Sequence, residues 1–184
     1  VTLSAANTYT GVTTIETGTV RTGLLADGGS ASGIGASSNA AANLVLNGGT
    51  LEYTGGTVST NRLFTVGTSG GTIHLSGNGP VNFTNTGAIA FQGSGPRTLT
   101  LSSDISTFFT TTMAAVIGDG PGGATSLTIG GTRAWQLSGA NTYTGTTTIT
   151  STLVAGAVNT PPSLRAVTVG GPFDLGGFNQ MIGL

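Results

Sequence analysis

The chain of 184 residues is rich in small side chains and poor in charge: it holds 33 Gly and 35 Thr, and only 6% of its residues are charged. Gly and Thr are poor helix formers, so this composition excludes a helical protein. A net charge of −1 with five scattered Arg and no Lys excludes a basic surface for nucleic acid, and the absence of Cys excludes disulfides and thiolate metal sites.

A fourteen-residue unit occurs twice. Residues 2–15 read TLSAANTYTGVTTI, and residues 136–149 read QLSGANTYTGTTTI. Most positions are identical, so we treat the two stretches as copies of one repeat, with units that start near residues 2 and 136. A Tyr that recurs beside Asn and Gly is typical of a corner packed against its own coil. We therefore predict structural repeat corners at Asn7, Tyr9, Gly11, Asn141, Tyr143 and Gly145.

Short apolar-x-apolar alternations, bounded by Gly, Asn or Ser, run through the rest of the chain. A period of two over such short stretches predicts strands with one buried face. The predicted strands are 44–46, 51–53, 64–66, 73–75, 81–83, 89–91, 99–101, 127–129, 135–137, 167–169 and 173–175.

The spacing of these strands favours a β-helix, or β-solenoid. Gly48 and Gly70 open similar units 22 residues apart, which is about one coil of a three-faced parallel β-helix. At this length the chain would make roughly eight to nine coils. An antiparallel sandwich also has many short strands, but no Asn-Gly or Asp-Gly turn joins two matched runs here. We expect residues 1–184 to form a single β-helix segment, excised from or repeated within a longer assembly.

The repeated unit resembles the passenger-associated transport repeat of the autotransporter-associated β-strand proteins of bacteria. The stretches 47–52, 116–128 and 175–183 resemble the same proteins. This resemblance implies a right-handed parallel β-helix in an extracellular passenger at the bacterial cell surface. It also implies export by an outer-membrane translocator, and a repeat associated with secretion and folding rather than with catalysis.

The candidate chemical groups are sparse and scattered. The acidic residues are Glu16, Asp27, Glu52, Asp104, Asp119 and Asp174. Glu52 and Asp174 occupy the middle of apolar-x-apolar triplets, which predicts solvated side chains. His74 is the lone histidine, 22 residues after Glu52, so we expect the two to stack on the outer face. The Gly-rich stretches around Asp27 and Asp119 are interpreted as turns rather than calcium sites. We predict no catalytic residue, no cofactor and no metal.

These patterns favour a non-catalytic structural and adhesive segment, a stalk or surface-presenting rod. Its partners would be neighbouring repeats or other copies at the β-helix ends, and host surfaces or glycans. Open strand edges leave a second interpretation, a subunit that stacks head to tail into an extracellular fibre. A polysaccharide-degrading β-helix enzyme is a third interpretation, disfavoured because no cluster of acids is visible.

Overall fold

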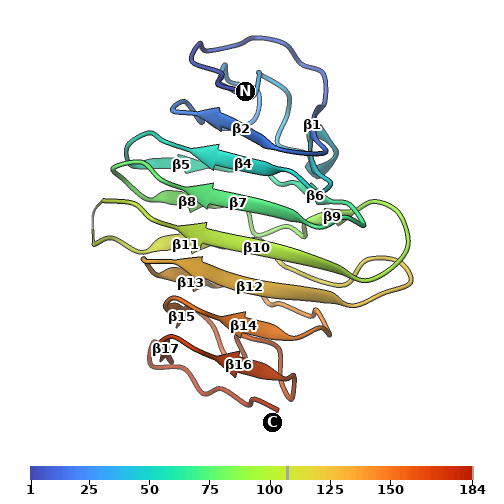
Figure 1. The fold of residues 1–184 in the computed structure, drawn as a ribbon, viewed down its shortest axis with the longest axis vertical. Helices are drawn as coiled ribbons and strands as arrows, with labels where there is room; N and C mark the ends of the chain where they lie inside the picture. The colour runs from blue at the N-terminus through green and yellow to red at the C-terminus, as the bar shows by residue number, and fades with distance from the viewer. Residues whose placement is uncertain (107, 184) are drawn as a thin grey trace.

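The structure is a computed structural model that describes residues 1–106 and 108–183, and it is a stack of parallel strands (Figure 1). These residues form three parallel sheets and one short 3-10 turn, η1 (Ala41–Asn43). The predicted all-β parallel β-helix is therefore confirmed. No helix in this part of the chain is long and apolar enough to cross a bilayer.

The three sheets contain seven, six and four strands. The seven-stranded sheet consists of β2 (Thr19–Thr22), β4 (Thr50–Tyr53), β7 (Gly71–Leu75), β10 (Arg97–Ser103), β12 (Thr125–Gly131), β14 (Thr147–Ile149) and β16 (Val167–Val169). The six-stranded sheet consists of β5 (Val58–Thr60), β8 (Val81–Phe83), β11 (Thr111–Met113), β13 (Trp135–Leu137), β15 (Leu153–Ala155) and β17 (Phe173–Asp174). The four-stranded sheet consists of β1 (Thr13–Ile15), β3 (Leu44–Leu46), β6 (Thr65–Val66) and β9 (Ala90–Phe91).

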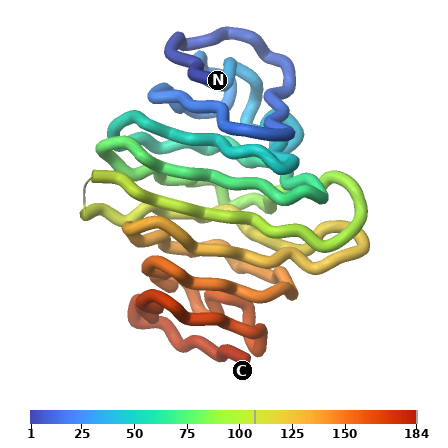
Figure 2. The backbone as a smooth tube through the Cα atoms, in the orientation of Figure 1, coloured from blue at the N-terminus to red at the C-terminus, as the bar shows by residue number. Residues whose placement is uncertain are grey.

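Each complete coil visits the three sheets in turn, as the tube in Figure 2 shows. The chain passes from β4 in the seven-stranded sheet to β5 in the six-stranded sheet, then to β6 in the four-stranded sheet, and returns at β7. Beyond β9 the third face continues without a named strand in the described residues, and residues 138–146 connect β13 directly to β14. The C-terminal coils therefore consist of two strands and a loop.

The coils differ in length. Glu52 pairs with His74, as the 22-residue spacing predicts. The neighbouring coils are longer: Arg21 and Glu52, which pair with each other, are 31 residues apart, and the paired residues His74 and Ser102 are separated by 28 residues. The longer coils contain extended loops, which add residues to a coil without adding a strand. The predicted count of eight to nine coils is consequently not confirmed: within the described residues the longest sheet has seven strands, with a single bridge beyond each end.

A file of apolar side chains runs along the inner side of the seven-stranded sheet. Its members are in register on consecutive strands and no more than 2% exposed: Leu51, Ile73, Leu101, Ile129 and Ile149. Parallel pairing places like side chains above one another, so the short alternating triplets of the sequence combine into one continuous core.

The outer side of the same sheet carries one Thr per strand in a single row. The row is Thr19, Thr50, Thr72, Thr100, Thr128, Thr148 and Thr168. Thr favours strands and adds no charge, so this face is uniform and neutral along its middle.

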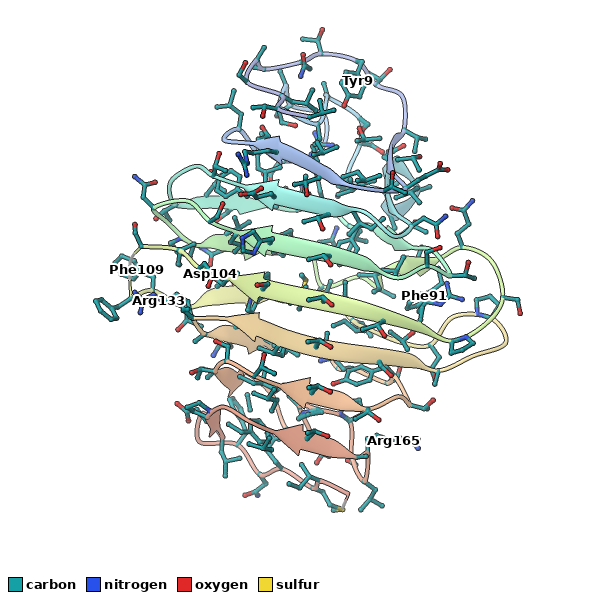
Figure 3. The ribbon with its side chains drawn as sticks, viewed as in Figure 1. Tyr9, Phe91, Asp104, Phe109, Arg133 and Arg165 are labelled. Carbon is teal, nitrogen blue, oxygen red and sulfur yellow. The ribbon has the colours of Figure 1, made fainter. Side chains whose placement is uncertain are left out.

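The two ends of the rod differ. Loops 3–12 and 24–40 lie over the first coil, and Ile34 within the second loop is 1% exposed. Figure 3 shows Tyr9 at this end and Arg165 near the other. Large apolar side chains are exposed toward the C-terminal end: Val158, Leu164, Val169, Leu175, Phe178, Met181 and Ile182.

Candidate functional site

The second copy of the repeat forms a packed corner between β13 and β14. Tyr143 is fully buried, and its hydroxyl lies 2.7 Å from Oγ1 of Thr147. Burial raises the pKa of Tyr143, and the hydrogen bond with Thr147 opposes this more weakly. The side-chain oxygen of Asn141 accepts a 2.9 Å hydrogen bond from the Ile117 amide of the previous coil. At Gly145 an added Cβ would lie 2.4 Å from the Thr125 carbonyl oxygen, so the close approach requires glycine.

The first copy makes the same internal contact in a more open setting. Tyr9 is 41% exposed, and its hydroxyl lies 2.8 Å from Oγ1 of Thr13. Asn7 donates from Nδ2 to the Gly33 carbonyl at 2.8 Å, whereas a Cβ added at Gly11 would have no neighbour within 4 Å. The corner role of the six predicted residues stays a proposal, which the shared Tyr–Thr contact supports.

The two copies occupy different faces of the solenoid. In the first copy the strand after the corner, β1, belongs to the four-stranded sheet. In the second copy the equivalent strand, β14, belongs to the seven-stranded sheet. The repeat therefore encodes a corner and the strand that follows it, but not the face on which that strand lies.

Asp119 ties the second corner to the preceding loop. Its Oδ1 accepts hydrogen bonds from the amides of Thr125 and Thr144, and its Oδ2 accepts one from the Thr144 hydroxyl at 2.6 Å. Burial alone would raise the pKa of Asp119, but these hydrogen bonds outweigh it and the pKa is lowered. The carboxylate is thus engaged in closing a turn.

Glu52 and His74 are direct neighbours in register, which confirms their predicted stacking. Glu52 does not form an ion pair with His74: it pairs with Arg21 at 2.9 Å, and His74 Nε2 lies 3.9 Å from Oδ2 of Asp104. The expectation that Glu52 is solvated was wrong, because it is only 8% exposed beneath Arg21 and Ser76. Burial would raise the pKa of Glu52, but hydrogen bonds from Ser76 and Arg21, with the charges of Arg21 and His74, lower it.

The remaining acids lie on separate elements: Glu16 follows β1, Asp27 lies in an N-terminal loop and Asp174 ends β17. Among the described residues no group of three or more His, Cys, Asp or Glu is placed to hold a metal ion.

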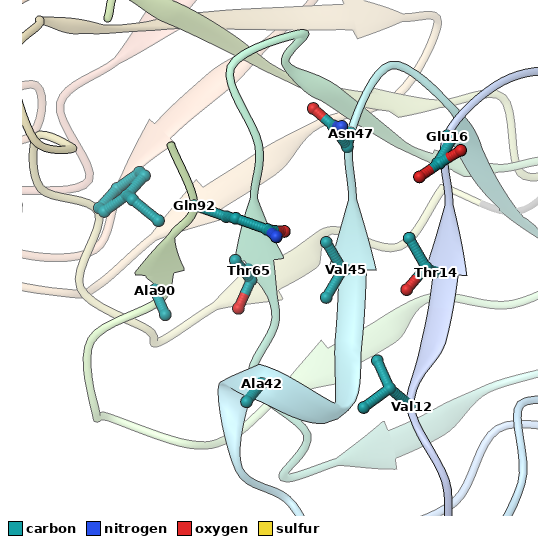
Figure 4. Close-up of a pocket in the computed structure, with 10 residues that line it drawn as sticks. Val12, Thr14, Glu16, Ala42, Val45, Asn47, Thr65, Ala90 and Gln92 are labelled. Carbon is teal, nitrogen blue, oxygen red and sulfur yellow. The ribbon is translucent and has the colours of Figure 1, made fainter. Parts of the chain in front are cut away.

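An open groove of about 660 Å³ crosses the outer face of the four-stranded sheet (Figure 4). Its floor is a row of side chains in register, one from each strand: Thr14, Val45, Thr65 and Ala90. Val45 and Thr65 are only 8% and 6% exposed although they point outward. The middle of the floor is therefore less exposed than Thr14 and Ala90 on the outer strands.

Polar side chains follow the strands along this groove. Figure 4 shows Glu16 and Asn47 at one end of β1 and β3, Val12 and Ala42 at the other, and Gln92 extending toward the floor. Among the lining residues Glu16 alone carries a charge. No side-chain hydrogen bond within the described residues engages Glu16 or Gln92.

Arg97 supports one end of the groove from behind. Its guanidinium is buried, donates to the carbonyl oxygens of Val66 at 2.9 Å and Gln92 at 3.0 Å, and lies 5.3 Å from the centre of the Phe91 ring. Neither the role of this arginine nor the groove was predicted from the sequence. A lone Arg among Gly and Pro gives no signal of a carbonyl-binding role, and the groove needs four strands that are distant in sequence.

The fold defines the chain as a parallel β-solenoid that contains two copies of a tyrosine-containing repeat. Comparison with known proteins identifies that repeat: the family model of the passenger-associated-transport-repeat matches residues 1–21 and 127–151. The predicted recognition, similarity to the autotransporter-type repeat proteins that are displayed at the bacterial cell surface, is therefore confirmed.

A similar curated protein is the "Adhesin BmaC autotransporter" of Brucella suis biovar 1 (strain 1330), which is 50% identical over 99 residues. The aligned segment covers 53% of this chain but only 3% of that protein. No solved structure matched the chain.

Proposed function

We propose that the chain is a non-catalytic, structural and adhesive segment of an extracellular autotransporter passenger, and that it acts as a surface-presenting rod. The observation that carries this proposal is the pair of passenger-associated-transport-repeat matches on a continuous β-solenoid. Similarity to a protein named as an adhesin supports the adhesive part of the role.

The physical properties of the rod suit this role. Buried apolar files hold the coils together, while Thr and other uncharged side chains cover most of the outside. A chain with 6% charged residues presents a nearly neutral surface over its whole length. Repetition of coils extends that surface without a new core, because each coil contacts only its neighbours.

Display on bacterial cells tests the proposal. The chain, joined to an outer-membrane translocator, should become accessible to added protease and should increase attachment of the cells to a coated surface, relative to the translocator alone. Replacement of Tyr143 by Ala should reduce the displayed amount, because it empties the buried corner of the second repeat.

Gln136→Ala is the control variant, since this side chain lies on the outer face of β13 and is only half-buried. Full display without any gain in attachment would contradict the adhesive role, and equal display of the Tyr143→Ala and Gln136→Ala variants would contradict the role of the repeat corner.

A second candidate function is a subunit that stacks head to tail into a fibre. The observation that favours it is the exposed apolar C-terminal coil, where Val169 is 53% exposed while Ile149 directly above it is fully buried. Sedimentation of the purified chain over a range of concentrations tests this candidate, because head-to-tail stacking would produce assemblies that grow with concentration.

A further inference from the structure

We propose that the groove across the four-stranded sheet binds a short, neutral oligosaccharide, an inference that rests on the proposed adhesive function and names the ligand class of one site within it. The groove, defined by Thr14, Glu16, Asn47, Thr65 and Gln92 with their apolar neighbours, has a volume of about 660 Å³. This lies within the range of small-molecule sites.

The ligand must be recognised by side chains. The floor is the face of a sheet, whose backbone N–H and C=O groups bind one another along the ladder between β1, β3, β6 and β9. A peptide that adds a strand needs a free sheet edge, and this face offers none. What projects into the groove is a carboxylate, two amides and hydroxyl groups.

These groups match a polyhydroxyl ligand. Amides both donate and accept hydrogen bonds, and a carboxylate can accept from two neighbouring hydroxyls at once. Glu16 and Gln92 make no side-chain hydrogen bond within the described residues. The amide nitrogen of Asn47 is likewise uncommitted in them, because the Ser69 amide binds only the side-chain oxygen.

The charge of the groove selects against acidic sugars. Glu16 is the charged lining residue, and no Arg or His lines the groove with it. A sialylated or sulfated glycan would bring a negative charge toward an unpaired carboxylate. The apolar floor at Val45 and Ala90, with Phe91 at one end, leaves surface for the C–H faces of a neutral sugar.

The groove is also held in shape before any ligand binds. The Thr65 hydroxyl donates to the Ala41 carbonyl at 2.9 Å, which fixes the short turn η1 beside the floor. Arg97 binds the Gln92 carbonyl and stacks on Phe91, so this wall is anchored to the core. A preformed site loses less conformational freedom on binding.

The test is to probe the 184-residue chain with an array of immobilised neutral, sialylated and sulfated oligosaccharides. The affinity for the best neutral probe is then measured by titration. We expect binding to neutral oligosaccharides, with about tenfold weaker affinity for Glu16→Ala and for Gln92→Ala, since each removes at least one hydrogen bond to the sugar. Asn47→Ala,Gln92→Ala should abolish measurable binding.

The matched control is the double variant Asn82→Ala,Gln136→Ala, which also removes one Asn and one Gln side chain, but from the outer face of the six-stranded sheet. Binding confined to acidic glycans, absence of any neutral ligand at millimolar concentration, or equal loss in the control variant would each overturn the proposal. Attachment of displaying cells separates the two proposals: attachment that persists without glycan binding overturns the groove assignment and leaves the adhesive role standing.

Discussion

Arg62 gives the sharpest test of how the N-terminal end of the rod is held together. The side chain is 5% exposed, and its guanidinium binds the loop that covers the first coil. Nε donates to the Ala26 carbonyl at 3.0 Å, Nη1 to the Ser37 carbonyl at 2.9 Å, and Nη2 to the carbonyls of Ser30 and Gly35 at 3.1 and 3.0 Å. Burial lowers the pKa of Arg62, but arginine stays protonated in proteins.

The cost of removing this side chain follows from what its partners would lose. The Ser37 carbonyl also accepts from the Gly29 amide, and the Gly35 carbonyl from the Ser32 hydroxyl, so neither becomes an unpaired group. The variant therefore loses mainly the stabilisation from several hydrogen bonds that the charged guanidinium donates. Part of this cost is offset, because the folded state no longer has to bury a charge away from water. We expect Arg62→Met to lower the free energy of unfolding by about 2–4 kcal/mol.

Arg62→Lys should destabilise the chain at least as much. An ammonium keeps the buried charge, but it has at most three donors and lacks the planar fork that reaches partners on several sides. Restoration of stability by Lys would show that charge rather than donor geometry matters at this position.

Urea unfolding gives the change in stability, and hydrogen exchange of residues 26–37 shows whether the loop opens locally. Arg165→Met is the control, because Arg165 is exposed and makes no side-chain hydrogen bond within the described residues, so its change should stay within about 0.5 kcal/mol. Equal unfolding midpoints for Arg62→Met and Arg165→Met, with equal exchange in residues 26–37, would show that the hydrogen bonds of Arg62 do not hold this loop in place.

Three further predictions concern the repeat, the buried acid and the core. Tyr143→Phe should lower the free energy of unfolding by about 1 kcal/mol, because it leaves the buried Thr147 hydroxyl without its hydrogen-bond partner. Tyr9→Phe, in the exposed first copy, should cost less than half of that. Equal effects of the two variants in urea unfolding would contradict the importance of burial for this contact. The pKa of Glu52 is lowered in the folded state, so the stabilisation by its carboxylate is complete above the usual pKa of 4.5 and is lost as the pH falls through the lower folded-state pKa. Glu52→Gln should therefore flatten the decline in the free energy of unfolding between about pH 5 and pH 2. An unchanged slope would count against a stabilising ion pair with Arg21. Ile129→Ala, in the middle of the apolar file, should lower the free energy of unfolding by about 2–5 kcal/mol, as measured by thermal or urea unfolding. Val169→Ala, at the exposed end of the file, should lower it by less than about 1 kcal/mol. A similar cost at both sites would mean that the C-terminal coil is covered in solution.

Local sequence was a reliable guide to strands wherever the chain alternates between apolar and other residues. The triplets at 44–46, 81–83, 135–137 and 167–169 coincide with β3, β8, β13 and β16. Several strands that follow Thr-rich or mixed patterns were not predicted: β1, β2, β5, β11, β14 and β15. Thr fits strands, turns and corners alike, so a pattern made of Thr does not separate them.

Coil length escaped prediction for a different reason. The 22-residue spacing between Gly48 and Gly70 is real, but it applies to one coil and not to its neighbours. Loops such as 24–40 lengthen a coil without disturbing the register of the strands, because loop closure becomes only slowly more costly with length. The number of coils therefore cannot be obtained by dividing the chain by one period.

The fold class and the repeat were predictable from sequence, because period-two alternation and a near-identical unit of fourteen residues are local properties. The face that each copy occupies was not predictable in this way. Any face of a parallel solenoid accepts the same alternation, and the lengths of the intervening coils set which face a given strand joins. Stacking likewise brought Glu16, Asn47 and Gln92 to one groove and buried Arg62 and Arg97 among carbonyl groups. Those contacts join residues that are tens of positions apart in the sequence, so no local sequence pattern predicts them.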